Sequence, residues 1–222
     1  TAGGAAGGGN VSFGGTINGT TNFAESLTVN GGTGGDLAFT GAVGASVPLG
    51  NFTITNARHV NFNANVFADT VNQVAGTGNT TVLGNMTANV GGISMTTDRI
   101  TFNGVINTGG QDLFLSAANG VTQTGGFFQG DQLLVLGSGN FSLNVATNNI
   151  ATSVAANITS GSLNFTNGAE VRVDQLTNNS GTTTGITVAG NVTLQSTNGV
   201  ITLNAPITAT GGTVTLNANG TV

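Results

Sequence analysis

The sequence predicts an all-β fold and, within that class, a right-handed parallel β-helix in which successive coils of the chain stack into a β-solenoid. Three observations predict it: short triplets with apolar ends, a repeat of about 20–22 residues with some longer intervals, and turn residues at fixed places in the repeat. Helices are not expected, because β-branched residues and 38 glycines are spread along the 222 residues, and both disfavour helices.

The triplets have the two-residue period of β-strands. Disorder is the competing interpretation of a chain so rich in Gly, Asn, Ser and Thr. The recurrence of Val, Ile, Leu and Phe from one end of the chain to the other argues against it, because these side chains can be buried together. The triplets include Leu27-Thr28-Val29, Phe52-Thr53-Ile54, Leu113-Phe114-Leu115, Leu163-Asn164-Phe165, Val192-Thr193-Leu194 and Val214-Thr215-Leu216.

Each triplet belongs to a longer motif of strand, corner and second strand. The motif is clearest when the segments that begin at Gly110, Gly190 and Gly212 are aligned. An apolar residue returns eight positions after the first, and the Asn and Gly between them suit a corner because they tolerate positive φ. The same spacing recurs at Phe52, Ile54 and Val60, at Leu133, Val135 and Phe141, and at Leu163, Phe165 and Val171.

One complete coil is predicted between Val192 and Val214, an interval of about 22 residues that lies in the range of solenoid repeats. Its three expected walls are formed by Val192 with Leu194, by Val200 or Ile201 with Leu203, and by Ile207 with Ala209.

The intervals from Leu113 to Phe141 and from Leu163 to Val192 are six or seven residues longer than this period. We therefore expect a loop or an added short strand in both coils. Before Leu113 the register is harder to follow.

A single coil cannot bury its apolar side, so neighbouring coils must stack at the strand spacing of roughly 4.8 Å. About ten coils make a rod on the order of 50 Å long, and parallel crossovers favour the right-handed form. Equivalent Asn residues are expected to form hydrogen-bonded ladders and equivalent Phe residues to stack. Both prolines, Pro48 and Pro206, are placed beside corners.

The chain is expected to contain one domain. Residues 1–10 are predicted to be a Gly/Ala-rich N-terminal arm, and residues 11–222 a single β-solenoid domain whose repeats are clearest over 110–222. No capping segment is recognised at either end. Two explanations are left open: a piece of a longer exoprotein, or copies that stack end to end as a homopolymer, with the arm added to a neighbour as a strand.

Charge and composition exclude several classes of partner. Only 5% of the residues are charged, with three Lys or Arg against eight Asp or Glu and a net charge of −5. Nucleic-acid binding needs clustered cations and is excluded. Membrane insertion is not expected, because no stretch approaches the roughly 18 apolar residues of a spanning helix. Without Cys, disulfides and Cys-based metal sites are excluded as well.

The motifs resemble the repeats of filamentous haemagglutinin-type bacterial surface proteins, of autotransporter passengers and of related large exoproteins. The resemblance rests on the Gly-Gly or Gly-Asn entry, the Val-Thr-Leu type of triplet, the Asn-Gly corner and the period, all clearest from Gly110 to Val222. It implies secretion to the bacterial cell surface, an extended shaft, and a role in adhesion, aggregation or biofilm. Neither Pro48 nor Pro206 lies in the Asn-Pro-Asn type of motif of the secretion domain, so the resemblance is to the shaft.

No catalytic, cofactor-binding or metal-binding residue is predicted. The segment Gly31–Phe39 fits the calcium-binding nonapeptide of β-rolls, but it stands alone and has Ala38 where a large apolar residue belongs. A glycine corner is expected there, with calcium near Asp36 left open. His59 is the only histidine, too few for a metal cluster, and the sequence supplies no partner for it as a general base.

The remaining charged residues are interpreted as surface groups. Glu170, Arg172 and Asp174 alternate with valines, so they are expected to point outward from one strand and to pair with one another. The Asp98-Arg99 pair is expected to form a charged corner rather than a catalytic pair.

The expected function is that of a structural and adhesive extracellular protein: a shaft segment of an adhesin, or the subunit of a self-assembling filament. Surface glycans or proteins of host or neighbouring cells are the expected partners, together with end-to-end self-association, and no cofactor is expected. The alternative is a polysaccharide-processing β-helix enzyme, a lyase or hydrolase, which requires a groove with at least two carboxylates within about 10 Å of each other. Scattered carboxylates and the absence of Trp and Tyr favour the structural protein.

Overall fold

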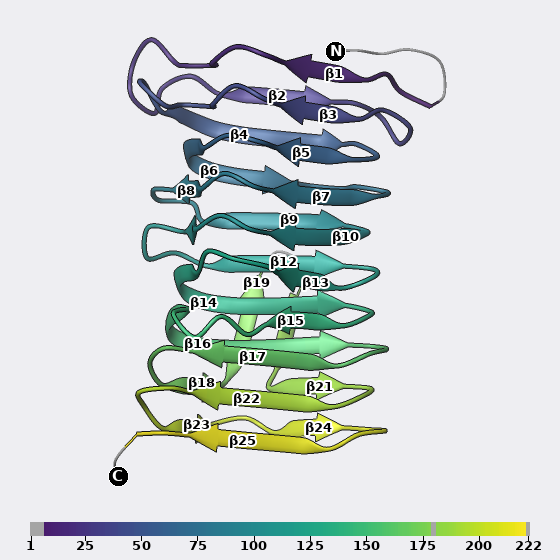
Figure 1. Ribbon diagram of the computed structural model, residues 1–222, viewed down its shortest axis with the longest axis vertical. Helices are drawn as coiled ribbons and strands as arrows, with labels where there is room; N and C mark the ends of the chain where they lie inside the picture. Colours follow the sequence, from purple (N-terminus) through teal and green to yellow (C-terminus); the bar gives the residue numbers. More distant parts are fainter. Residues whose placement is uncertain (1–6, 179–180, 221–222) are drawn as a thin grey trace.

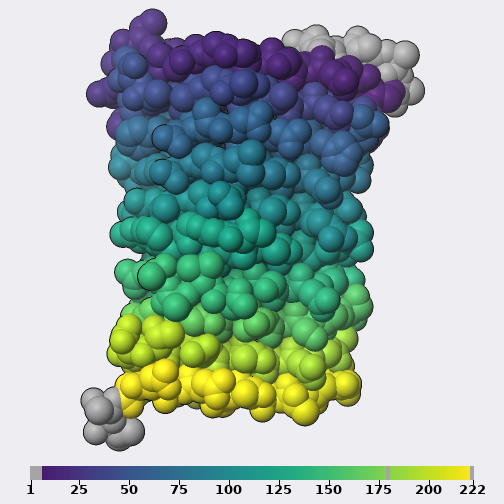
Figure 2. Space-filling view, viewed as in Figure 1, coloured from purple at the N-terminus to yellow at the C-terminus, as the bar shows by residue number. Residues whose placement is uncertain are grey.

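The computed structural model describes residues 7–178 and 181–220, which form a stack of coils with strands on every coil (Figure 1). The described residues contain no helix, and β19 with β20 is the only antiparallel pair among them. In space-filling view the colours follow the sequence in successive bands across the rod, so each coil contacts chiefly the coils before and after it (Figure 2). The prediction of an all-β parallel β-helix is confirmed.

One face of the solenoid, called sheet A here, has ten described strands in sequence order, each parallel to its neighbours. The strands of sheet A are β1 (Val11–Phe13), β3 (Leu37–Phe39), β5 (Val60–Phe62), β7 (Asn79–Val82), β10 (Arg99–Phe102), β13 (Val121–Gln123), β15 (Phe141–Leu143), β17 (Leu163–Asn167), β22 (Val192–Ser196) and β25 (Val214–Ala218).

The opposite side, called sheet B here, has thirteen described strands. It unites the second and third expected walls, because the long strand β14 pairs with both β11 and β12 of the preceding coil. The strands of sheet B are β2 (Leu27–Asn30), β4 (Leu49–Asn56), β6 (Val66–Gln73), β8 (Met86–Ala88), β9 (Ile93–Thr97), β11 (Ile106–Asn107), β12 (Leu113–Ala117), β14 (Phe128–Gly137), β16 (Asn149–Ile158), β18 (Val171–Val173), β21 (Ile186–Val188), β23 (Ile201–Leu203) and β24 (Ile207–Ala209).

The interior is one continuous apolar cluster that runs through the coils. Phe13, Phe39 and Phe62 stack in it with ring centroids 4.9 and 5.1 Å apart, so the predicted Phe stack is confirmed. Phe52 packs edge-on against Phe39 from sheet B, at 5.2 Å. Offset and edge-to-face pairs of this kind contribute about 0.5–1.5 kcal/mol beyond the area they bury.

Asn side chains link neighbouring coils at the corners, as predicted. Asn65 Oδ1 accepts a hydrogen bond from the N–H of Asn85, and Asn85 Oδ1 accepts one from Val105, both at 2.9 Å. At the Asn119-Gly120 corner, Gly120 has a φ of 89°, and a Cβ there would lie 2.2 Å from the carbonyl oxygen of Asn140. Only glycine fits this close approach between coils.

The last expected coil is confirmed by strands β22 to β25. Ile201, rather than Val200, begins β23, where it pairs with Val171. Both prolines precede strands, Pro48 before β4 and Pro206 before β24.

The prediction of an inserted loop or strand between Leu113 and Phe141 is wrong. Leu113 lies in sheet B and pairs with Leu133, whereas Phe141 lies in sheet A and pairs with Val121. Both pairs are 20 residues apart, so this coil has the regular length and no insertion. The sequence pattern is misleading here because the strand–corner–strand spacing is the same whether the chain passes from sheet A to sheet B or from sheet B to sheet A. Leu113 in sheet B therefore aligns with Val192 in sheet A, although the two strands belong to different sheets.

The long interval from Leu163 to Val192 does contain an insertion, as expected. These two residues pair across adjacent coils although they are 29 residues apart. The extra residues form a hairpin of β19 (Gln175–Asn178) and β20 (Gly181–Thr184).

The expected N-terminal arm is only partly described. Its residues 1–6 lie outside the described residues, as does Val222 of the last repeat. Gly9 donates a backbone hydrogen bond to Gly31 at 3.0 Å, so the end of the arm contacts the following coil.

Candidate functional site

The hairpin β19–β20 is the largest departure from solenoid geometry among the described residues. It leaves the coil after Asp174 and returns at Gly185, whose N–H donates to the Asp174 carbonyl at 3.0 Å. In Figure 1, β19 runs across the direction of the solenoid strands, from the level of β18 toward that of β12. The hairpin therefore lies over the outer face of sheet B and spans several coils.

Apolar side chains on that outer face hold the hairpin. Leu134 of β14 and Ala155 of β16 point away from the main core, yet they are buried because Leu176 of β19 packs on them. Phe114 and Leu136 pack partly buried against this second cluster. Burying one leucine side chain contributes about 1.5–3 kcal/mol, which is enough to dock a short hairpin.

A groove of about 500 Å³ opens between the tip of β19 and the outer face of sheet B. This volume lies within the range of about 300–1,000 Å³ that is typical of small-ligand sites. Residues from four segments far apart in the sequence line it: Asn72 and Val74 in and after β6, Gly91, Ile93, Ser94 and Thr96 in and before β9, Asp112 and Phe114 before and in β12, and Thr177 and Asn178 in β19.

Strand register places the floor of this groove in one column. Asn72 of β6 pairs with Ser94 of β9, and Ser94 pairs with Phe114 of β12. Phe114 then pairs with Leu134, which the hairpin covers. Because paired parallel strands lie about 4.8 Å apart, an amide, a hydroxyl and an aromatic ring follow one another at that spacing.

Asp112 is the one charged residue among the described residues that line the groove. Partial burial of its carboxyl raises its pKa, and the negative charge of Asp131 in β14 raises it further. Thr152 donates a hydrogen bond to Asp131, whereas the Asp112 carboxylate accepts no hydrogen bond from the described residues. The groove therefore presents a hydrogen-bond acceptor that the fold leaves available.

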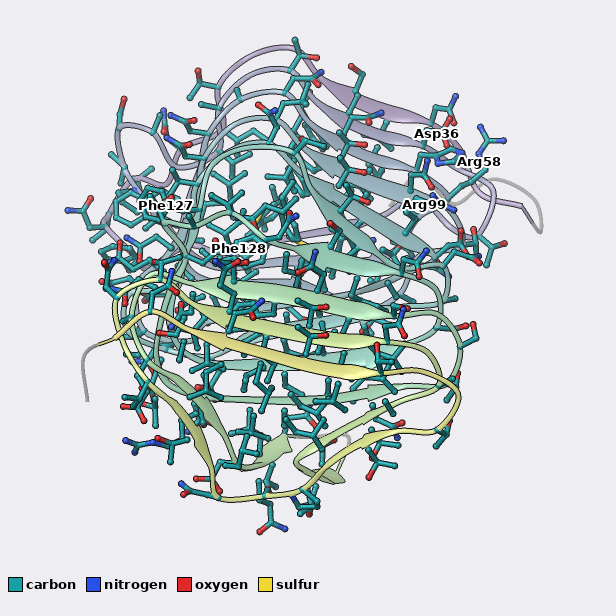
Figure 3. The ribbon with its side chains drawn as sticks, turned by 60° about the horizontal axis from the view of Figure 1, so that its bottom comes forward. Asp36, Arg58, Arg99, Phe127 and Phe128 are labelled. Atoms are coloured by element: carbon teal, nitrogen blue, oxygen red, sulfur yellow. The ribbon has the colours of Figure 1, made fainter. Side chains whose placement is uncertain are left out.

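The structure places Asp36 at another corner, away from the groove. Arg58 donates to both of its carboxylate oxygens, from Nε at 2.8 Å and Nη2 at 2.6 Å, and holds the pKa of Asp36 below its ordinary value. His59 lies beside them, and its Nδ1 accepts a hydrogen bond from the N–H of Asn79 at 2.9 Å. Figure 3 shows Asp36, Arg58 and Arg99 at one edge of the coils and Phe127 at the opposite edge.

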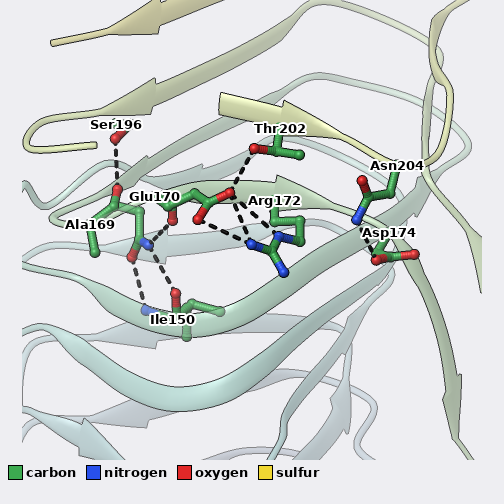
Figure 4. A network of polar contacts seen from close by, with 9 residues as sticks. Ile150, Ala169, Glu170, Arg172, Asp174, Ser196, Thr202 and Asn204 are labelled. Atoms are coloured by element: carbon green, nitrogen blue, oxygen red, sulfur yellow. Dashed lines mark hydrogen bonds and ion pairs between the residues drawn. The ribbon is translucent and has the colours of Figure 1, made fainter. Parts of the chain in front are cut away.

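The charged segment around β18 behaves as expected at Glu170, just before the strand, and Arg172 within it, which form an ion pair at 3.3 Å (Figure 4). A hydrogen bond from Thr202 at 2.7 Å, followed by the contact with Arg172, lowers the pKa of Glu170. Asp174 instead accepts a hydrogen bond from Asn204 at 2.9 Å. Each of these contacts joins groups on the same or the next coil.

Asp98 lies at the corner between β9 and β10, where Asn119 of the next coil donates to it at 2.5 Å. Arg99 begins β10. The described residues contain no group of three or more His, Cys, Asp or Glu arranged to hold a metal ion, and no helix long and apolar enough to cross a membrane.

Sequence reasoning missed the groove, although one signal for it is present. Phe114 occupies the central position of its triplet, which Thr or Asn occupies in the other triplets. The run Leu133-Leu134-Val135-Leu136 likewise places leucines on the outer face of β14. Apolar residues at outward positions of a strand indicate that something covers that face.

No family model, curated protein or solved structure matches this chain.

Proposed function

We propose that the chain is a structural and adhesive segment of an extracellular bacterial surface protein, acting in adhesion, aggregation or biofilm. The single apolar core that runs from coil to coil is the observation that carries the proposal, because such a core makes a stiff spacer. The resemblance of its repeats to those of haemagglutinin-type exoproteins supports secretion to the cell surface. The low content of charged residues suits a shaft built from stacked walls.

The dimensions suit a short spacer that carries a binding groove on its side. The ten described strands of sheet A are separated by nine steps of about 4.8 Å, so the rod is about 43 Å long. The groove lies on the side of this rod, over β6, β9 and β12, where a partner can reach it.

End-to-end association is the narrower form of the proposal. Leu203, Val214 and Leu216 in the last described coil are 43–49% exposed, although their equivalents in earlier coils are buried. One further coil, from the same polypeptide or from a second copy, would cover them. Static light scattering over a range of concentrations should show growing mass, and a constant monomer mass would contradict the filament form.

Adhesion can be tested with beads coated with the folded chain. They are expected to bind to bacterial or host cells, or to aggregate with one another, more strongly than beads coated with the heat-unfolded chain. Equal binding by both preparations would contradict the adhesive function.

The enzyme alternative is supported by one observation, the electrostatic coupling of Asp112 in the groove to Asp131. A carboxyl group with a raised pKa that lies near a second carboxylate is a feature of glycoside hydrolysis. An enzyme should shorten polysaccharide chains, with release of reducing ends or formation of double bonds, and both Asp112→Asn and Asp131→Asn should abolish that activity. An adhesin should bind the same polysaccharides without cleaving them.

A further inference from the structure

We infer that the groove between the hairpin β19–β20 and the outer face of sheet B binds an uncharged oligosaccharide, an inference that rests on the proposed adhesive function and names its partner. The groove and its column of outward side chains are the geometric basis.

The backbone groups of the groove floor are already hydrogen-bonded to neighbouring strands. Strand β9 pairs with β6 on one side and β12 on the other, and β12 also pairs with β14. A peptide cannot add to these strands, because strand addition needs a free edge. A ligand on the groove floor, which these strands form, therefore meets side chains rather than backbone groups.

Those side chains match a polyhydroxylated ligand. Asn72 offers an amide, Ser94 and Thr96 offer hydroxyls, and Asp112 offers carboxylate oxygens. Amides and hydroxyls both donate and accept, as sugar hydroxyls do, and a carboxylate accepts from them strongly. Phe114 adds a partly exposed aromatic ring, a surface on which the C–H face of a sugar ring can pack.

Charge restricts the ligand further. The described lining contains no Lys, Arg or His, and its one charged residue is Asp112. An acidic glycan would need a cation, usually an arginine that binds carboxylate or phosphate in bidentate fashion. The second charge that acts on Asp112 is that of Asp131, which is also negative. Anionic sugars are therefore repelled, and neutral ones are accommodated.

The raised pKa of Asp112 indicates that its charge does not stabilise the fold, so its contribution to ligand binding can be tested apart from stability. Its pKa is raised in the folded protein, so ionisation of this group costs stability above that pKa, and the cost is relieved as the pH falls through it. A carboxyl group with a raised pKa that also faces a groove is a candidate for ligand contact. We expect Asp112→Asn to leave the free energy of unfolding at neutral pH unchanged or slightly higher.

The test is isothermal titration of the full chain with tetrasaccharides of three classes: neutral glucose, mannose, galactose or N-acetylglucosamine; acidic galacturonate; and cationic glucosamine. At least one neutral tetrasaccharide is expected to bind, with the acidic one at least tenfold weaker. Asp112→Asn and Phe114→Ala should each weaken binding at least tenfold. The matched control Asp98→Asn removes the same charge at a corner outside the groove and should leave affinity unchanged.

Three results would overturn the inference: no neutral tetrasaccharide binds, the acidic or the cationic one binds best, or Asp98→Asn weakens binding as much as Asp112→Asn. If coated beads still adhere to cells in these cases, the adhesive function stands and only its glycan partner is wrong. If the neutral sugar binds in the groove but the beads do not adhere, the adhesive function fails and the glycan site stands.

Discussion

The coils between β5 and β15 and the coil between β17 and β22 share one interior but differ on their outer faces. In the first region, paired residues of sheet A are 20 or 21 apart along the chain. In the second, Leu163 and Val192 are 29 apart, yet they pair in the same way. The interior therefore sets the fold, and an insertion on the outside leaves it intact.

The insertion is tolerated because its two ends meet. The Asp174 carbonyl accepts a hydrogen bond from Gly185 at 3.0 Å, so the chain returns to where it left the coil. The entropic cost of a closed loop grows slowly with its length, by about 0.6 kcal/mol for each doubling. The hairpin thus supplies one wall of the groove at small cost, while the regular coils supply the floor.

The largest loss of stability is expected from a substitution in the interior of the regular coils. Phe62 is 1% exposed and stacks on Phe39 at 5.1 Å, so Phe62→Ala should lower the free energy of unfolding by about 3–5 kcal/mol. Phe127, at the partly exposed edge, provides the control, and Phe127→Ala should cost less than about 1 kcal/mol. Urea denaturation measures both, and equal losses would mean that the interior is not the main source of stability.

A smaller effect is expected when the outer face is returned to regular geometry. Replacing residues 175–184 with one glycine, together with Leu134→Thr, gives a coil of regular length with a polar outer face. The free energy of unfolding should fall by about 1–2 kcal/mol, because only the small outer cluster is lost. Circular dichroism should still show β-structure, and oligosaccharide binding should disappear. Loss of cooperative unfolding would contradict the independence of the two regions.

The smallest effect is expected at the Asp36–Arg58 ion pair, whose side chains are 31% and 49% exposed and are screened by solvent. The lowered pKa of Asp36 means that the pair stabilises the fold above the ordinary pKa of aspartate, and that this contribution is lost as the pH falls through the lower folded value. Arg58→Gln should therefore be slightly less stable than the parent at pH 7, and the difference should shrink as the pH falls below the ordinary pKa of aspartate. A difference that grows in acid would contradict this assignment.

The sequence predicted the fold better than the register. Coil Val192–Val214 was predictable because its inward positions are apolar and its corners contain Gly. The more regular coils before it were not, in part because Thr80 points inward, 0% exposed, where it donates to Gln73 at 2.8 Å. A polar pair inside the core removes the apolar signal on which repeat searches depend.

The groove could not have been predicted from local pattern. It needs β6, β9, β12 and β19, which are up to about a hundred residues apart and are brought together only by the stacking of coils. Phe114 and Leu134 show that an outer face is covered, but which segment covers it depends on where the hairpin points. Asp112 gave no signal of its own in the sequence.

Successive coils stack in register through the described residues, and distances between spin labels can measure this stacking. The chain has no Cys, so labelled cysteine pairs can be placed along the outward column of sheet A. Thr101 with Asn164, and Ser142 with Thr215, are each three strand steps apart, although only the second pair spans the hairpin. Pulsed electron resonance should give the same backbone separation for both pairs, about 14 Å. Separations that differ by a strand spacing or more would contradict the stacked solenoid.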